Sequence, residues 1–119
     1  MKIRLDIDGT SAIATLEDSE AARDFASMLP LTLSLMDYAA TEKISDLPRQ
    51  LSIRGAPKGV AGRGGDITYY APWGNLAIFV EDGTGNYTGD LMRLGRVQTG
   101  LPALQRPGPL QVRIERMTD

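Results

Sequence analysis

The chain opens with a strict alternation of apolar and polar residues. Over residues 3–8, three aliphatic side chains fall on one face of an extended strand and charged side chains on the other. A period of two with one apolar face is typical of a half-buried β-strand. Asp8-Gly9 comes next, a pair that readily adopts the positive φ of a two-residue hairpin turn. Because residues 12–17 then resume an extended pattern, the sequence predicts an opening β-hairpin.

Similar short patterns recur along the rest of the chain. Further strands are predicted at residues 31–36, 66–71, 76–80, 91–97 and 110–114, with a brief strand at 51–54. Residues 41–50 are predicted to be a turn and connector instead, since Pro48 has no N–H to donate within a central strand.

Helical patterns are few. Asp18 or Ser19 is suited to cap a helix start, and small or apolar residues then recur at helical spacing up to Pro30. The residue before a proline avoids the α region, so one helix is predicted over residues 19–29. A single helical turn is predicted at residues 101–105.

Seven or eight short strands with frequent turn signals indicate a mainly-β fold with one or two short helices. The chain has 119 residues, which fits one domain over residues 1–119. Neither an internal repeat nor a linker divides it. We expect a closed or nearly closed barrel, and favour it over a sandwich because closure removes exposed sheet edges.

Composition narrows the chemistry. The chain contains no cysteine and no histidine, which excludes thiolate nucleophiles, Ser-His-Asp triads, and metal sites that depend on either residue. No residue pattern predicts a cofactor or a metal site. The net charge is −2, so we expect neither a nucleic acid nor a membrane surface as partner. Charges interrupt the first residues, and no apolar run is long enough to span a bilayer, so a cytoplasmic location is expected.

The order of the predicted elements, taken with several short motifs, resembles the cyclophilin fold and, more closely, the small bacterial and archaeal cyclophilin-like proteins. The segments that carry the resemblance are Asp37-Tyr38 with Glu42 and Leu47-Pro48, Gly65-Asp66-Ile67, Tyr69-Tyr70-Ala71-Pro72, Leu76-Ala77-Ile78-Phe79, and Leu94-Gly95-Arg96-Val97. It covers nearly the whole chain and implies an eight-stranded cyclophilin-like barrel.

Cyclophilins are prolyl cis/trans isomerases, and the resemblance implies a place for their catalytic arginine. In the family it stands in Phe-His-Arg, shortly before Gln-Gly-Gly-Asp. Here Ser52-Ile53-Arg54 precedes Arg63-Gly64-Gly65-Asp66. The Gly-Gly-Asp matches, but the Phe-His is missing, Arg63 replaces the glutamine, and Arg54 is one residue out of register. Only Arg54 is therefore carried over as a candidate catalytic residue.

Two regions suggest ligand binding. Residues 55–65 contain five glycines among cations that extend from Arg49 to Arg63. Cations beside glycine amides are suited to hold a small anion, although a solvated loop explains them better. Most of the aromatic residues lie between Tyr69 and Tyr87, as expected for a ligand pocket or a groove for a proline-containing peptide, or for ordinary packing. The candidate ligand-binding residues are Tyr38, Glu42, Arg54, Arg63, Tyr69, Trp73 and Tyr87.

These observations leave three functional hypotheses. The first is a binding module for a small ligand or a peptide that lacks the usual isomerase residues. The second is a prolyl isomerase that uses Arg54, since a cation that polarises the prolyl amide is sufficient in principle. The third is a structural protein whose exposed aromatic side chains contact a partner or a second copy. The sequence does not specify the ligand or the oligomeric state.

Overall fold

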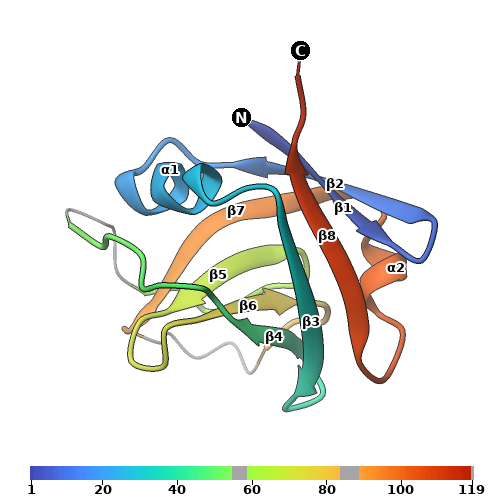
Figure 1. Cartoon of the computed structure of the whole chain (residues 1–119). Helices are drawn as coiled ribbons and strands as arrows, with labels where there is room; N and C mark the ends of the chain where they lie inside the picture. Colours follow the sequence, from blue (N-terminus) through green and yellow to red (C-terminus); the bar gives the residue numbers. More distant parts are fainter. Residues whose placement is uncertain (55–58, 84–88, 119) are drawn as a thin grey trace.

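The computed structural model describes residues 1–54, 59–83 and 89–118. In these residues the chain forms eight strands and two short helices (Figure 1). The strands are β1 (Lys2–Ile7), β2 (Thr10–Leu16), β3 (Leu31–Tyr38), β4 (Glu42–Asp46), β5 (Asp66–Tyr70), β6 (Asn75–Phe79), β7 (Leu91–Thr99) and β8 (Leu110–Arg116). The helices are α1 (Glu20–Ser27) and α2 (Leu101–Leu104).

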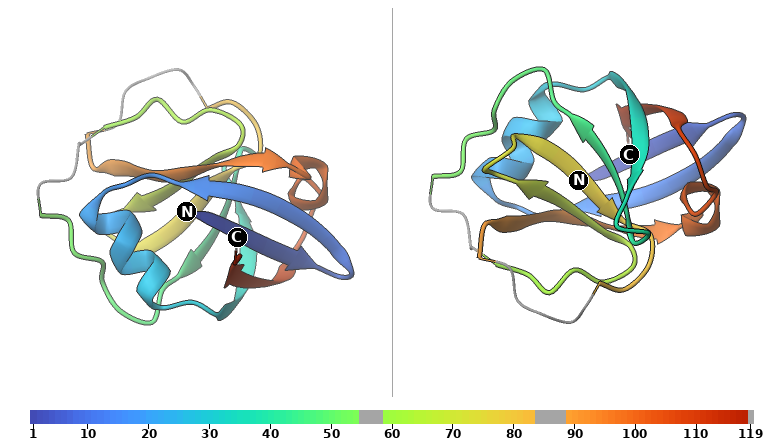
Figure 2. Two further views of the ribbon diagram at one scale, coloured as in Figure 1. Left: turned by 90° about the horizontal axis from the view of Figure 1, so that it is seen from above. Right: turned by 90° about the horizontal axis from the view of Figure 1, so that it is seen from below.

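The sheet closes on itself in the order β1-β2-β7-β5-β6-β4-β3-β8, and each described pair of neighbours is antiparallel. Figure 2 shows the barrel from above and below. Each described strand therefore has a hydrogen-bonded neighbour on both sides, which removes the exposed edges that promote aggregation. The mainly-β closed barrel expected from the sequence is confirmed.

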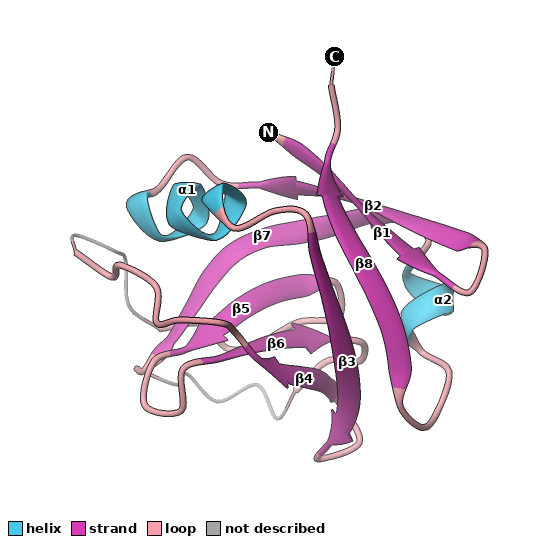
Figure 3. Ribbon diagram, viewed as in Figure 1, coloured by secondary structure: helices cyan, strands magenta, loops and turns pink. Residues whose placement is uncertain are grey.

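The barrel interior is filled by alternate side chains of the strands. Aliphatic residues such as Leu5, Leu35, Ile78 and Leu94 are fully buried there. The two helices lie at opposite ends of the barrel (Figure 3), and both contribute buried side chains to the same core. The Ser19 hydroxyl accepts a hydrogen bond from the N–H of Ala22 at 3.1 Å, so the predicted helix cap is confirmed.

The prediction for residues 41–50 was wrong, because β4 lies within that stretch. This stretch lacks the usual apolar alternation of a strand because its buried inward-facing residue is Lys43, which is 1% exposed. Lys43 lies opposite Asp37 on β3, and its Nζ lies 2.5 Å from Asp37 Oδ1 and donates to the carbonyl of Gly108 at 2.6 Å. The inward charge is thus compensated by partners from two other segments, which no local pattern records.

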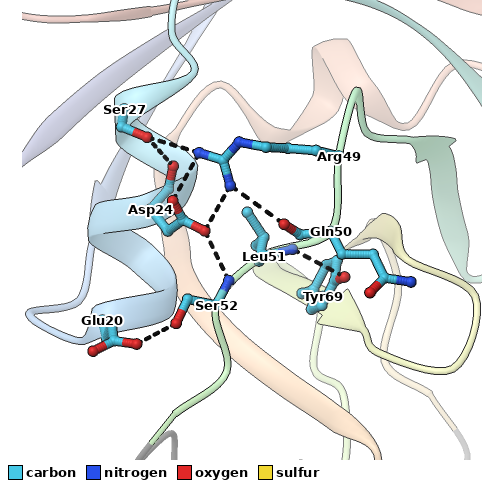
Figure 4. Close-up of polar contacts among 8 residues, drawn as sticks. All are labelled: Glu20, Asp24, Ser27, Arg49, Gln50, Leu51, Ser52 and Tyr69. Atoms are coloured by element: carbon cyan, nitrogen blue, oxygen red, sulfur yellow. Dashed lines mark hydrogen bonds and ion pairs between the residues drawn. The ribbon is translucent and has the colours of Figure 1, made fainter.

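The brief strand predicted at residues 51–54 does not form. Side chains of helix α1 instead bind the connector, residues 49–52 (Figure 4). The Asp24 carboxylate accepts two hydrogen bonds from the Arg49 guanidinium, both at 2.8 Å, and a third from the N–H of Ser52 at 2.7 Å. Side chains of α1 therefore bind this backbone in place of a neighbouring strand.

Candidate functional site

A cavity of about 280 Å³ lies on the outer wall of the barrel, over β4 and β6. The register pairs Glu42 with Phe79 and Ile44 with Ala77, and all four side chains line this cavity. They point outward because the alternate residues of β6 point into the core. Strand pairing therefore builds the floor and one end of the cavity.

The other lining residues come from neighbouring elements. They include the end of β3, the end of β5, the turn that joins β5 to β6, and the start of β7. The complete lining is Tyr38, Glu42, Ile44, Tyr70, Trp73, Asn75, Ala77, Phe79 and Leu91. Apolar and aromatic side chains with a few polar groups are the usual lining of small-molecule sites.

Three aromatic rings form the rim. Trp73 makes edge-to-face contacts with Tyr38 and with Tyr70, at ring-centroid distances of 5.9 Å and 5.3 Å. Trp73 lies in a tight turn that ends at Gly74, whose φ of 66° favours glycine. Tyr38 and Trp73 are 43% and 59% exposed. The rim is therefore exposed to solvent, whereas Ala77 and Phe79 beneath it are largely buried.

Glu42 is the charged residue of the lining. Its side chain is half-buried, and desolvation by burial raises the pKa of its carboxyl above the usual range. No described lysine or arginine lies within ion-pair distance of it. In the described part of the chain, this carboxylate is uncompensated.

Asn75 is the most unusual polar residue of the site. It is 5% exposed, and its Oδ1 atom receives no hydrogen bond from any residue that the structure describes. Nearly all buried polar atoms in proteins have a partner, because leaving one unpaired costs about 1–3 kcal/mol. Because the Oδ1 atom is itself buried, this unpaired acceptor is enclosed within the cavity wall and is not open to the cavity.

The structure brings together three of the predicted site residues, Tyr38, Glu42 and Trp73, in this cavity. It places Tyr69 elsewhere, in the barrel core, where it is 1% exposed and its hydroxyl accepts a hydrogen bond from the N–H of Leu51 at 3.2 Å (Figure 4). Arg54 and Arg63 are exposed and are not part of the lining. The predicted residue Tyr87 lies outside the described residues.

Six of the nine lining residues were not among the sequence candidates, and Tyr70 and Asn75 are the two of these with polar side-chain groups. Tyr70 was predictable, since the alternation that turns Ile67 and Tyr69 inward turns Tyr70 outward. Asn75 follows a proline-containing turn and carries no such signal. Its importance depends on what surrounds its side chain.

The anion site predicted in the glycine-rich loop stays a prediction, and two of the loop's described amides have partners within the protein. The N–H of Arg63 donates to the Asp66 carboxylate at 3.0 Å, and the N–H of Gly64 donates to Asp82 at 2.9 Å. Arg96 also binds Asp66, at 2.5 Å. These two amides are therefore already occupied by carboxylates of the protein itself.

The described ranges lack two further features. These ranges contain no group of three or more acidic side chains placed to hold a metal ion. Neither described helix has the length and apolar character needed to cross a bilayer.

Fold and site together define a closed antiparallel β-barrel with a ligand-sized cavity in its outer wall. The model of the cyclophilin-like family matches residues 5–115. The chain therefore belongs to the cyclophilin-like family, as the sequence motifs suggested.

Solved structures share this fold. The solution structure of the hypothetical protein AF2241 from Archaeoglobus fulgidus has a TM-score of 0.70 at 16% identity, covering 98% of this chain and 95% of that one. A structure of McbB in complex with tryptophan has a TM-score of 0.64 at 14% identity, covering 98% of this chain and 46% of McbB. No curated protein matches the sequence.

Proposed function

We propose that this protein is a binding module of the cyclophilin-like family and that the outer-wall cavity is its binding site. The observation that carries the proposal is a cavity with an aromatic rim and an apolar floor that also contains the half-buried Glu42 carboxylate. This carboxylate, which no described cation compensates, favours a ligand that donates a hydrogen bond, and the apolar floor favours one with a hydrophobic part.

The size of the cavity favours a small molecule or one side chain of a peptide. A second, shallower depression of about 350 Å³ adjoins it and shares Ile44 and Asn75 with it. Met36, which is 48% exposed, lines this second depression. Together the two depressions offer a groove across β3, β4 and β6 that suits a short peptide, including a proline-containing one.

Binding is proposed in preference to prolyl isomerisation. An isomerase of the expected kind needs a cation beside an apolar proline pocket. Among the described residues, the lining contains no lysine or arginine. Self-association through the exposed Tyr38, Met36 and Trp73 is the other alternative, and a concentration-dependent mass by light scattering would favour it.

The test is a screen of mixed small fragments and Xaa-Pro peptides by amide chemical shifts, with Trp73 fluorescence as a second readout. Trp73 is the only tryptophan of the chain, so its emission reports on the rim directly. Hits are expected to shift the amides of Glu42, Asn75 and Ala77. A screen without shifts at these residues would contradict the proposal.

A further inference from the structure

The charged side chains that line the cavity and the adjoining depression are carboxylates. Glu42 lines the cavity, and Asp46, which lies opposite Asn75 in the register, lines the adjoining depression. Among the described residues, no lysine or arginine lines either one. The nearby cation Lys43 points to the other face of the sheet and is paired with Asp37. A ligand in the cavity therefore experiences carboxylates without compensating cations.

The hydrogen-bonding character of the site has the same bias. An ionised Glu42 carboxylate only accepts hydrogen bonds. It lies at one end of the Ile44–Ala77 floor, because Glu42 pairs with Phe79 and Ile44 with Ala77. A ligand that satisfies this carboxylate must donate.

The rim adds a third contribution. Because Trp73 is perpendicular to both Tyr38 and Tyr70, the three rings present π faces in more than one direction. Aromatic π faces attract cations, and tryptophan does so most strongly. Rings and carboxylate thus favour the same charge.

From these observations we propose that the ligand is an organic cation that carries N–H donors, namely a primary ammonium or a guanidinium group on a short apolar stem. This inference rests on the proposed binding function. The charged group lies beside Glu42 under the aromatic rim, and the stem packs on Ile44, Ala77 and Phe79. The source is a free amine or a lysine or arginine side chain of a peptide.

Competing ligand classes fit less well. An anion is repelled by Glu42, and a neutral alcohol gains no ion pair or cation–π contact. A quaternary ammonium keeps the cation–π contact but has no N–H, so it donates no hydrogen bond to Glu42. The order of affinity among small probes therefore identifies the class.

The experiment measures binding of n-butylammonium, n-butylguanidinium, tetramethylammonium, n-butanol and butyrate at one ionic strength, by calorimetry and amide shifts. The two N–H cations are expected to bind at least about tenfold more tightly than butanol or butyrate, as one charge-assisted hydrogen bond implies. Glu42→Gln keeps the shape and is expected to abolish that preference while leaving butanol unchanged. Trp73→Leu is expected to weaken cation binding about threefold.

Asp8→Asn is the matched control, because it also removes one carboxylate but lies in the β1–β2 turn, across the barrel from β6. It is expected to leave the probe affinities unchanged. Butanol or butyrate binding as tightly as the N–H cations, or tetramethylammonium binding more tightly, would overturn the inference while the binding function stands. No shift at the cavity with any probe would overturn both. Lysine- and arginine-containing peptides, compared with the free amines, then distinguish the two sources.

Discussion

Tyr38 and Trp73 meet edge to face across the outer wall of the barrel, with their ring centroids 5.9 Å apart. Tyr38 lies opposite Glu42 at the end of β3, and Trp73 lies in the turn before β6. Their contact therefore passes over the floor of Ile44 and Ala77. It converts an open stretch of sheet into a cavity with an aromatic rim.

The Tyr38–Trp73 contact is measurable by a double-mutant cycle with Tyr38→Leu and Trp73→Leu. Edge-to-face pairs contribute about 0.5–1.5 kcal/mol, and the lower part of that range is expected here because both rings are partly exposed. Urea unfolding of the four proteins gives the coupling energy. A coupling indistinguishable from zero would show that the rim is not held by this pair.

Asn75 and Thr68 are both buried polar residues on the outer wall, and we expect them to respond oppositely. Asn75→Leu removes an unpaired acceptor and should leave the free energy of unfolding unchanged or slightly higher. The Thr68 hydroxyl donates to the carbonyl of Ala77 at 2.6 Å, so Thr68→Val should cost about 1 kcal/mol. Denaturant unfolding compares the two, and a larger loss for Asn75→Leu would contradict this account.

The ion pair between the buried Lys43 and the exposed Asp37 predicts an asymmetry. Lys43→Met replaces the buried charge by an apolar side chain of similar length, so the stability should change little. Asp37→Leu should be more destabilising, because it leaves the Lys43 ammonium buried without its carboxylate and removes the acceptor for the N–H of Gly108 at 2.6 Å. Thermal unfolding of both variants shows which one is less stable. A Lys43→Met variant less stable than Asp37→Leu would contradict this account of the ion pair.

Asp24 predicts a pH dependence. Hydrogen bonds from the Arg49 guanidinium and from the N–H of Ser52 lower the pKa of Asp24 to about 2 from 3.8. Because the pKa of Asp24 is lower in the folded than in the unfolded protein, its ionised carboxylate stabilises the fold at pH values above about 4. This stabilisation is lost as the pH falls from about 4 towards 2. Over this pH range the unfolding free energy of the wild type should fall by about 1–2 kcal/mol more than that of Asp24→Asn, after allowance for the 21% exposure of Asp24.

The measurement for Asp24 is the difference between wild-type and variant unfolding free energies across that pH range. Asp18→Asn serves as control, because Asp18 is 94% exposed and its pair with Arg23 lies on the surface. Parallel wild-type and Asp24→Asn profiles would show that the contact between α1 and the connector contributes little to the pH dependence of stability.

Arg54 offers a direct test of the isomerase hypothesis. It is exposed and does not line the cavity, so Arg54→Ala should leave any prolyl isomerisation rate on an Xaa-Pro peptide panel unchanged. The assay compares both proteins with the uncatalysed rate. A wild-type rate enhancement that disappears in Arg54→Ala would restore the enzyme hypothesis.

The sequence alone was sufficient to predict those elements whose conformation depends on their own residues. Alternation identified the first hairpin, and its Asp8-Gly9 turn has the positive φ values that the pair favours. Ser19 and Pro30 bracketed the first helix for equally local reasons. Frequent short strands with few helices then led to a closed barrel, since closure is one of few ways to satisfy so many strand edges.

The tertiary structure decided what depends on contacts between distant segments. Lys43 turns inward because Asp37 lies across from it, so β4 lacked an apolar pattern. Alternation separates Tyr69 from Tyr70, but only the turn that sets Trp73 against Tyr70 makes the outward ring part of a cavity. Asn75 gained significance only from the absence of a described donor around it. A sequence specifies its local conformations directly, whereas the partners of a buried polar group are set by cross-strand register and packing.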